Sequence, residues 1–218
     1  MPPLRIAIPI YTQVDMIDVA STVDTLKRIP DFSSFAVELD LVAATLDPIL
    51  TGQKVKIVPT KTFGDYNDDP LDVLLLPGAG DTSDATNDPV LMEFVKTQGA
   101  NARIVASVCT GALILGTAGL LDGYRATTHW MAIDGLKAMK NVRVVNGYPR
   151  WVHDRNRLTT GGVSSSLDGA LYLISLLTDD QTAKCVQLLV QYNPHPPFDC
   201  GDPSVADPDT YLRVVYGG

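Results

Sequence analysis

The sequence predicts an α/β protein built on a mainly parallel, doubly wound sheet. Along the whole chain, short β-branched or apolar runs alternate with longer segments whose apolar residues recur at helical spacing. Two of the short runs, residues 72–77 and 103–108, are almost entirely apolar, as strands covered on both faces are. Because parallel strands are joined by right-handed helical crossovers, we expect helices on both faces of one sheet.

The N-terminal part of the chain predicts a βαβ unit followed by an edge hairpin. Residues 4–10 are apolar and β-branched, residues 18–28 carry apolar side chains at helical spacing, and residues 36–44 alternate like a strand. Residues 54–58 alternate charged and apolar side chains, which is typical of an exposed hairpin. The apolar run at 72–77 then marks the centre of the sheet.

The next helix has a clear start signal. Asp88 is a favourable N-cap and Pro89 suits the first helical position. We expect the helix to continue through residues 90–97 and to stop at Gly99. The strand at 103–108 follows it.

The second half of the chain continues the alternation as far as residue 191. Its predicted elements are helices at 112–121 and 130–139, a strand at 142–145, a hairpin of 151–154 with 157–159, and helices at 163–177 and 180–191. From Asn193 onward the chain is rich in Pro, Asp and Gly, which indicates a surface strap. We expect a single domain over residues 1–218, with residues 193–218 as this strap.

Composition excludes several classes of function. With 218 residues, 45% of them hydrophobic, the chain can form one sizeable core. A formal net charge of −8 disfavours nucleic acid as a partner. The longest uncharged stretch, residues 104–121, contains several Gly, Ser and Thr, so we interpret it as buried core and expect no membrane span. The N-terminus lacks the pattern of a secretory signal, which indicates a cytoplasmic protein.

The cysteines do not form a disulfide or zinc pattern. Cys109, Cys185 and Cys200 are an odd number and have no C-x-x-C spacing, so we expect reduced thiols and no metal site. Cys185 lies on an amphipathic helix and is expected to pack in the core, whereas Cys200 lies in the strap. Cys109 remains as the candidate nucleophile.

Cys109 lies where the strand at 103–108 must turn abruptly into a helix, which is the arrangement of a nucleophile elbow. Such a turn points backbone N–H groups at the reacting atom, and Thr110 and Gly111 are the expected donors. The start of the following helix should stabilise a thiolate. The alternative is that Cys109 is only a small buried hydrophobe.

A thiol nucleophile needs an acid or base partner, and the sequence offers histidines and carboxylates. His153 and His195 are expected at the surface, while His129 could border the site or be purely structural. The Cys and His-x-Glu triad of class I glutamine amidotransferases is absent, because none of the histidines is followed two residues later by Glu. Asp18 follows the first strand and is either a catalytic carboxyl group or a helix N-cap, a role that Asp15 could equally fill.

Several motifs together resemble the isocyanide hydratase branch of the DJ-1/PfpI superfamily. They are VCTGALILGTAGLLDG from Val108, RATTHW from Arg125, LTTGGVSSSLD from Leu158 and YNPHPPF from Tyr192. The resemblance runs nearly from end to end and implies a flavodoxin-like fold, a homodimer, and hydration of a small isocyanide to an N-substituted formamide without a cofactor.

The family's catalytic Cys, the Thr after it and its Asp correspond to Cys109, Thr110 and Asp18. The resemblance thus favours the catalytic interpretation of Asp18, and it implies covalent chemistry in which Cys109 attacks the isocyanide carbon and Asp18 moves the protons. The expected substrate and oxyanion pocket comprises Gly78, Ala79, Gly111, His129, Gly162 and Val163.

The chain also departs from the family pattern, and other functions stay open. Ser21 and Thr22 replace a Gly-Pro pair after Asp18, Ala79 replaces a glycine, and Ser164 replaces a threonine. These changes concern the rim of the pocket and hence the choice of substrate. The alternatives are a glyoxalase or deglycase like the DJ-1 branch, in which Glu partners the Cys, and a non-catalytic redox-sensing or ligand-binding module.

Overall fold

The computed structural model describes residues 2–66 and 70–217. These residues form a seven-stranded sheet with the strand order β10-β11-β7-β6-β1-β2-β5. The strands of this sheet are β1 (Leu4–Pro9), β2 (Val37–Ala43), β5 (Lys61–Thr62), β6 (Val73–Leu76), β7 (Ile104–Ser107), β10 (Trp151–Asp154) and β11 (Arg157–Thr160). All neighbours pair in parallel except β10, which pairs antiparallel with β11 at the edge. The predicted α/β class with a mainly parallel sheet is confirmed.

The chain changes direction across the sheet between β1 and β6. From β1 it proceeds outward to β2 and β5, and it then returns to β6 on the other side of β1 before continuing to β7 and β11. In doubly wound sheets such a switch point opens a crevice at the carboxyl ends of the strands. This topology predicts where a site should lie.

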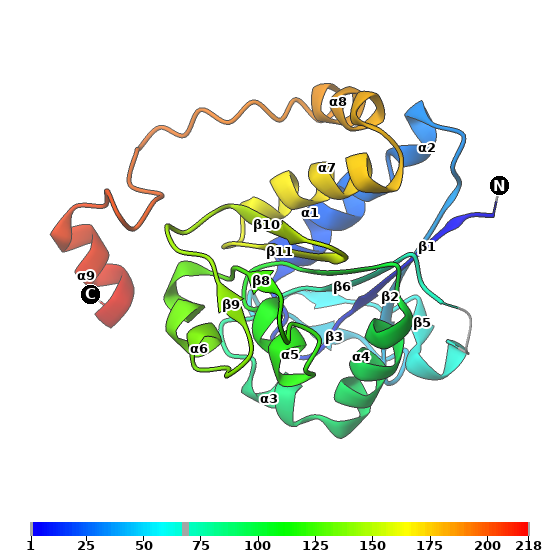
Figure 1. The fold of residues 1–218 in the computed structure, drawn as a ribbon, viewed down its shortest axis with the longest axis horizontal. Coiled ribbons are helices and arrows are strands. Elements are labelled where there is room, and N and C mark those ends of the chain that lie inside the picture. Colours follow the sequence, from blue (N-terminus) through cyan, green and yellow to red (C-terminus); the bar gives the residue numbers. More distant parts are fainter. Residues whose placement is uncertain (1, 67–69, 218) are drawn as a thin grey trace.

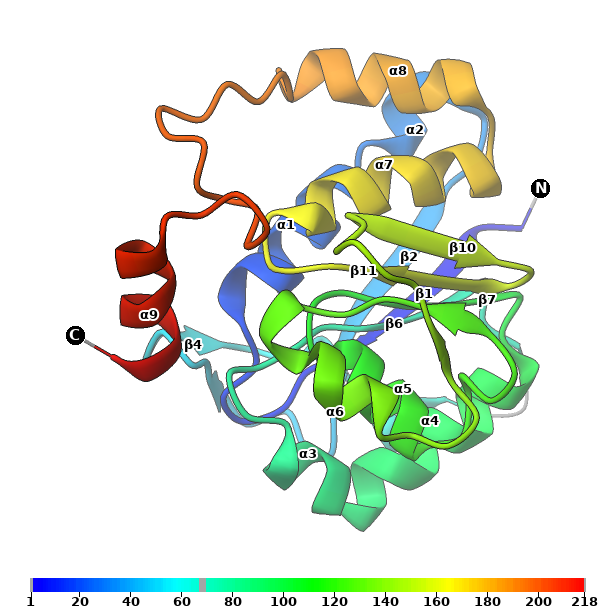
Figure 2. The ribbon, with the colours of Figure 1, turned by 60° about the vertical axis from the view of Figure 1, so that its left-hand side comes forward.

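Helices cover both faces of the sheet, as Figures 1 and 2 show. One layer contains α1 (Met16–Leu26), α2 (Ile29–Phe32), α7 (Ser165–Leu177) and α8 (Asp180–Leu189). The other contains α3 (Ser83–Asn87), α4 (Pro89–Asn101), α5 (Gly111–Thr117) and α6 (Ile133–Lys137). Two 3-10 turns, η1 (Phe63–Asp65) and η2 (Trp130–Ala132), complete the body. The described residues contain no helix long and apolar enough to cross a membrane.

Short strands lie outside the main sheet. Of the edge hairpin expected at 54–58, only β4 (Lys56–Ile57) lies in that range, and it pairs with β3 (Ile49–Leu50) in a separate sheet. The strand predicted at 142–145 is β9 (Arg143–Val144), which pairs only with β8 (Arg125–Ala126). Both pairs therefore form separate two-stranded sheets.

Several predicted helices have different limits, and three of them differ for an evident structural reason. Asp88 caps α4 by accepting hydrogen bonds from the N–H groups of Val90 and Leu91, but α4 does not stop at Gly99. It continues to Asn101, because Gly99 is buried and a β-carbon there would lie 2.4 Å from Leu120 Cδ1, so close packing requires the glycine. The helix expected at 112–121 ends at Thr117, since Gly119 has a φ of 75°. The helix expected at 130–139 is the turn η2 followed by α6.

The strap begins without regular structure and then forms a helix that was not predicted. Figure 1 shows residues 193–207 extending away from the body toward α9 (Pro208–Tyr216). None of the described residues 193–217 is buried. The ring of Tyr211 contacts that of Trp130, with a centroid distance of 5.4 Å.

Candidate active site

Four loops at the carboxyl ends of parallel strands meet at the switch point. They follow β1, β6, β7 and β11, and backbone hydrogen bonds join them. Asp15 N–H donates to Gly78 O at 2.8 Å, and Cys109 N–H donates to Gly161 O at 3.0 Å. The structure therefore brings the loops after residues 9, 77 and 109 together, and it adds the glycine turn at 161–162.

Cys109 has the strained backbone of a nucleophile elbow. Its φ is 55°, a region that side chains other than glycine rarely adopt. The carbonyl of Cys109 accepts a hydrogen bond of 2.8 Å from Thr128 Oγ1, and its N–H is bound by Gly161. The two flanking bonds hold the residue in this conformation, with only 6% of its surface exposed.

Two backbone amides lower the pKa of the Cys109 thiol. They belong to Thr110 and Val163. The expectation that Gly111 also donates is wrong, because its N–H is bound to Val108 O at 2.9 Å. Gly111 is needed instead for close packing, since a β-carbon there would lie 2.1 Å from Leu76 O. Val163 thus replaces Gly111 as the second donor.

The environment of Cys109 favours the neutral thiol. Burial, together with the nearby charges of Asp18 and Asp15, raises the pKa of the thiol to about 12, although the amides of Thr110 and Val163 act in the opposite direction. The amide at the start of the following helix does stabilise the thiolate, as predicted, but its effect is smaller than that of burial. Desolvation outweighs the two amides.

Asp18 lies in the first turn of α1, but it is not the cap. The cap is Asp15, whose side chain accepts from Ile17 N–H at 3.0 Å. Asp18 is fully buried, and its Oδ2 accepts a 2.8 Å hydrogen bond from Gly78 N–H. Its other oxygen, Oδ1, has no hydrogen-bond partner among the residues that the structure describes. Leaving a buried carboxyl oxygen without a hydrogen bond costs free energy of folding, so such an oxygen indicates a functional role.

Burial also sets the protonation of Asp18. It raises the pKa of the carboxyl group to about 7, while the Gly78 amide lowers it and the charge of Asp15 raises it. At neutral pH the group can therefore both donate and accept a proton.

The loop that follows β6 holds Asp18 and the elbow together. Thr110 Oγ1 donates to Ala79 O at 2.6 Å and accepts from Ala79 N–H at 2.8 Å. A β-carbon on Gly78 would lie 2.6 Å from Thr110 N and 3.0 Å from Asp18 Oδ2. Both groups therefore flank the same glycine, and no other residue fits there without moving them.

His129 borders the site through the glycine turn. Its Nδ1 accepts from Met131 N–H at 3.3 Å, and a β-carbon on Gly162 would lie 2.4 Å from His129 Cδ2. Burial lowers the pKa of the half-buried imidazole. His129 thus packs beside the turn that supplies the Val163 amide, and it remains neutral at physiological pH.

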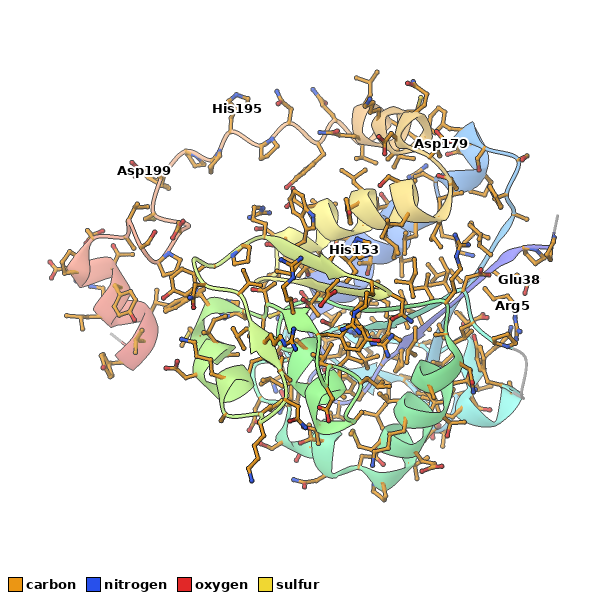
Figure 3. The ribbon with its side chains drawn as sticks, in the orientation of Figure 1. Arg5, Glu38, His153, Asp179, His195 and Asp199 are labelled. Atoms are coloured by element: carbon orange, nitrogen blue, oxygen red, sulfur yellow. The ribbon has the colours of Figure 1, made fainter. Side chains whose placement is uncertain are left out.

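The other thiols and histidines lie outside the site. His195 is exposed on the strap, as Figure 3 shows. His153, expected at the surface, is half-buried, and its Nδ1 lies 3.1 Å from Tyr172 Oη. Cys185 is only half-buried rather than part of the core, because α8 turns much of its surface to solvent. Cys200 is exposed.

Sequence reasoning missed two side chains at the site. Thr128 binds the Cys109 carbonyl, and its signal was its place directly before His129 in the TTHW motif. Tyr11 is buried in the loop after β1, and its hydroxyl donates to Pro77 O at 2.8 Å. Only its position in that loop could have indicated it.

Neither a metal cluster nor a surface groove elsewhere on the molecule competes with this site among the described residues. Within residues 2–66 and 70–217, no group of three or more His, Cys, Asp or Glu side chains is arranged to hold a metal ion. A groove of about 570 Å³ lies between α1 and β4, and it includes neither Cys109 nor Asp18.

A cysteine at a strand-to-helix elbow of a doubly wound sheet, faced by a buried carboxyl group, defines a class of flavodoxin-like proteins that share the plan of class I glutamine amidotransferases. Within this class, the model of the DJ-1/PfpI family matches residues 4–176. The chain belongs to the DJ-1/PfpI family.

The chain resembles relatives of several kinds, which include a hydratase and regulators. It is 39% identical over 203 residues to an isonitrile hydratase of Pseudomonas putida, covering 93% of this chain and 85% of the hydratase. It is 36% identical over 104 residues to an HTH-type transcriptional regulator of Pseudomonas aeruginosa, but it covers only 27% of that regulator. Among solved structures, a ThiJ/PfpI family protein from Pseudomonas syringae has a TM-score of 0.87 and 35% identity over 99% of this chain and 86% of its own.

Proposed function

We propose that this protein is an isocyanide hydratase, which adds water to an isocyanide to form an N-substituted formamide. The observation that carries the proposal is the fully buried Asp18, whose unpaired Oδ1 lies in the same small site as the strained Cys109. The similarity to the isonitrile hydratase of Pseudomonas putida supports the same substrate class. An isocyanide carbon accepts a nucleophile together with a proton, which is what a thiol and a carboxyl group provide.

The first step forms a covalent intermediate. The Cys109 sulfur attacks the terminal isocyanide carbon while its proton passes through Asp18 to that same carbon, giving a thioimidate, S–CH=N–R. The amides of Thr110 and Val163 stabilise charge that develops on the sulfur. Because the thiol is neutral at rest, Asp18 must be ionised to accept its proton.

The second step releases the product. Asp18 accepts a proton from water as the water oxygen attacks the thioimidate carbon, and it passes this proton to the nitrogen, which gives S–CH(OH)–NH–R. The C–S bond of this tetrahedral adduct then breaks while the hydroxyl proton passes through Asp18 to the sulfur, which releases R–NH–CHO and restores the thiol of Cys109. The active form therefore carries one proton on the Cys109 and Asp18 pair, so the rate should rise as the pH passes about 7. No cofactor enters these steps.

One assay tests the proposal. The same preparation is given an alkyl isocyanide or methylglyoxal, and loss of each compound is followed. We expect the isocyanide to be consumed with formamide as the product. Consumption of methylglyoxal alone would instead support a glyoxalase, although the partner of Cys109 is Asp18 and not the Glu of that branch.

The non-catalytic alternative makes a different prediction. A redox sensor needs an accessible thiolate, whereas Cys109 is 6% exposed and burial raises its pKa. Intact-mass measurement after mild peroxide treatment should therefore show little selective oxidation at Cys109. Rapid sulfinic acid formation there would favour the sensor.

The resemblance also supports proposals for assembly and location. We infer a homodimer, which sedimentation equilibrium would test, and a cytoplasmic location, where a catalytic thiol remains reduced. Apart from a second copy of the chain, the only partner that we expect is the small isocyanide substrate.

A further inference from the structure

Tyr11 connects to Asp18 through a single peptide group. Its buried hydroxyl donates to Pro77 O at 2.8 Å. The carbonyl of Pro77 and the N–H of Gly78 belong to the same peptide plane, and that N–H donates to Asp18 Oδ2 at 2.8 Å. A continuous hydrogen-bonded chain thus runs from the Tyr11 hydroxyl across one peptide to the carboxyl group.

Tyr11 and Asp18 bind the two sides of the Pro77–Gly78 peptide. Gly78 has no side chain, so its backbone is conformationally permissive. A β-carbon would restrict this freedom, but Thr110 leaves no room for one. The next carbonyl, Gly78 O, is held by Asp15 N–H, but this bond fixes the following peptide rather than the one that faces Asp18. Tyr11 supplies the bond on the opposite side of the critical plane.

We propose that Tyr11 is a positioning residue of the active site, which holds and polarises the Pro77–Gly78 peptide so that its amide binds the ionised carboxyl group of Asp18. The proposal rests on the proposed function for its consequence on rate, but not for the interaction itself. A hydrogen bond accepted by a carbonyl makes the N–H of the same peptide a stronger donor. Tyr11 should therefore favour the carboxylate form that accepts the proton of Cys109.

The charges around Asp18 are consistent with this role. The titratable groups that act on the site are Asp15, Cys109 and Tyr11 itself, with His129 near Asp15. Burial, Asp18 and Cys109 raise the pKa of Tyr11 well above its usual value. Tyr11 thus remains a donor throughout the pH range in which Asp18 titrates.

The test replaces Tyr11 by Phe, which removes only the hydroxyl. The carboxyl carbon of Asp18 is followed by ¹³C NMR across pH in protein labelled at aspartate, with Asp18→Asn used to assign the signal. We expect the apparent pKa of Asp18 to rise by about 0.5 in Tyr11→Phe, because the Gly78 amide becomes a weaker donor. The acid limb of kcat/KM should move by the same amount, which lowers the rate at pH 6 about threefold.

Tyr66→Phe is the matched control. The half-buried Tyr66 also donates to a carboxylate, Asp40 Oδ2 at 3.1 Å, but at the β2 and β5 edge of the sheet. The Tyr66→Phe substitution should leave the titration of Asp18 unchanged. An Asp18 titration in Tyr11→Phe that matches wild type would overturn the proposal. If the NMR shift appears while no isocyanide is consumed, the positioning role stands and the proposed function fails.

Discussion

At the level of single residues, the site favours the neutral forms of its two acids. Burial raises the pKa of Asp18 to about 7 and that of Cys109 to about 12. The two groups lie in one small site and interact, so they should titrate as a coupled pair. Reactivity then depends on moving one proton between them rather than on a preformed thiolate.

Replacing Cys109 by Ala should abolish isocyanide consumption and leave the fold intact. Alanine keeps the β-carbon, so it adds no backbone strain at a φ of 55°. The matched control is Cys185→Ala on the half-buried face of α8, which should change the free energy of unfolding by less than about 1 kcal/mol and leave turnover unchanged. The measurements are turnover and thermal melting, and substantial turnover in Cys109→Ala would sink the covalent mechanism.

Asp18→Asn should separate rate from stability. The amide can still accept from Gly78 N–H, but it cannot move protons, so the rate should fall by several orders of magnitude. The pKa of Asp18 is raised on folding, so the folded state binds the extra proton, and wild-type stability falls as the pH rises from about 4 to about 7. Because Asn cannot ionise, the variant does not lose stability over this pH range.

We therefore expect Asp18→Asn to melt close to wild type at pH 4 and above it at pH 8, by on the order of 4 kcal/mol in the free energy of unfolding. Thermal melts at both pH values check this difference. If the two proteins had the same stability at pH 8, Asp18 would not be held against its ionised form, and the proposed acid and base would lose its physical basis.

At the level of elements, the loop after β6 should tolerate no side chain at its first glycine. Gly78→Ala places a β-carbon 2.6 Å from Thr110 N, which must displace Asp18 or the elbow. A displacement of about 1 Å at reacting groups costs on the order of 100-fold in rate. Gly80→Ala is the control in the same loop, since a β-carbon there meets nothing within 4 Å. Steady-state kinetics of both variants would show whether the loop positions the site, and equal rates would show that it does not.

Most elements could be predicted from local patterns, and the exceptions have specific causes. Asp88-Pro89 correctly marked the start of α4, and Asp207-Pro208 is the same signal for α9, so that helix was predictable. Gly99 could not be interpreted correctly from sequence, because its role depends on contact with Leu120, 21 positions later. The pairing of β9 with β8 is likewise set by tertiary structure.

The candidate site was predictable in outline only. The abrupt strand-to-helix step indicated Cys109, and the resemblance favoured Asp18 over its capping alternative. No local pattern distinguishes Asp15 from Asp18 at the start of one helix, since both are favourable there. Burial distinguishes the two residues, and it also raises the pKa of the thiol, which we expected to be lowered.

At the level of the whole molecule, the body should be stable without its strap. None of the described residues 193–217 is buried, and an isolated helix as short as α9 is marginal in water. A chain that ends after Tyr192 keeps the hydrogen bond of that residue to Asp168. Its free energy of unfolding should fall by less than about 1 kcal/mol in urea, and a loss above about 3 kcal/mol would make the strap part of the core.

The depth of Cys109 also sorts reactants by shape. Only 6% of the surface of Cys109 is exposed, so a reactant must reach the thiol in confined surroundings. The terminal carbon of an isocyanide is the tip of a linear group and carries no other substituent, so it can enter end-on. A carbonyl carbon is trigonal and must present its flat face to the sulfur, which demands a wider entrance. Burial of the nucleophile thus favours linear reacting groups over planar ones before any bond is made.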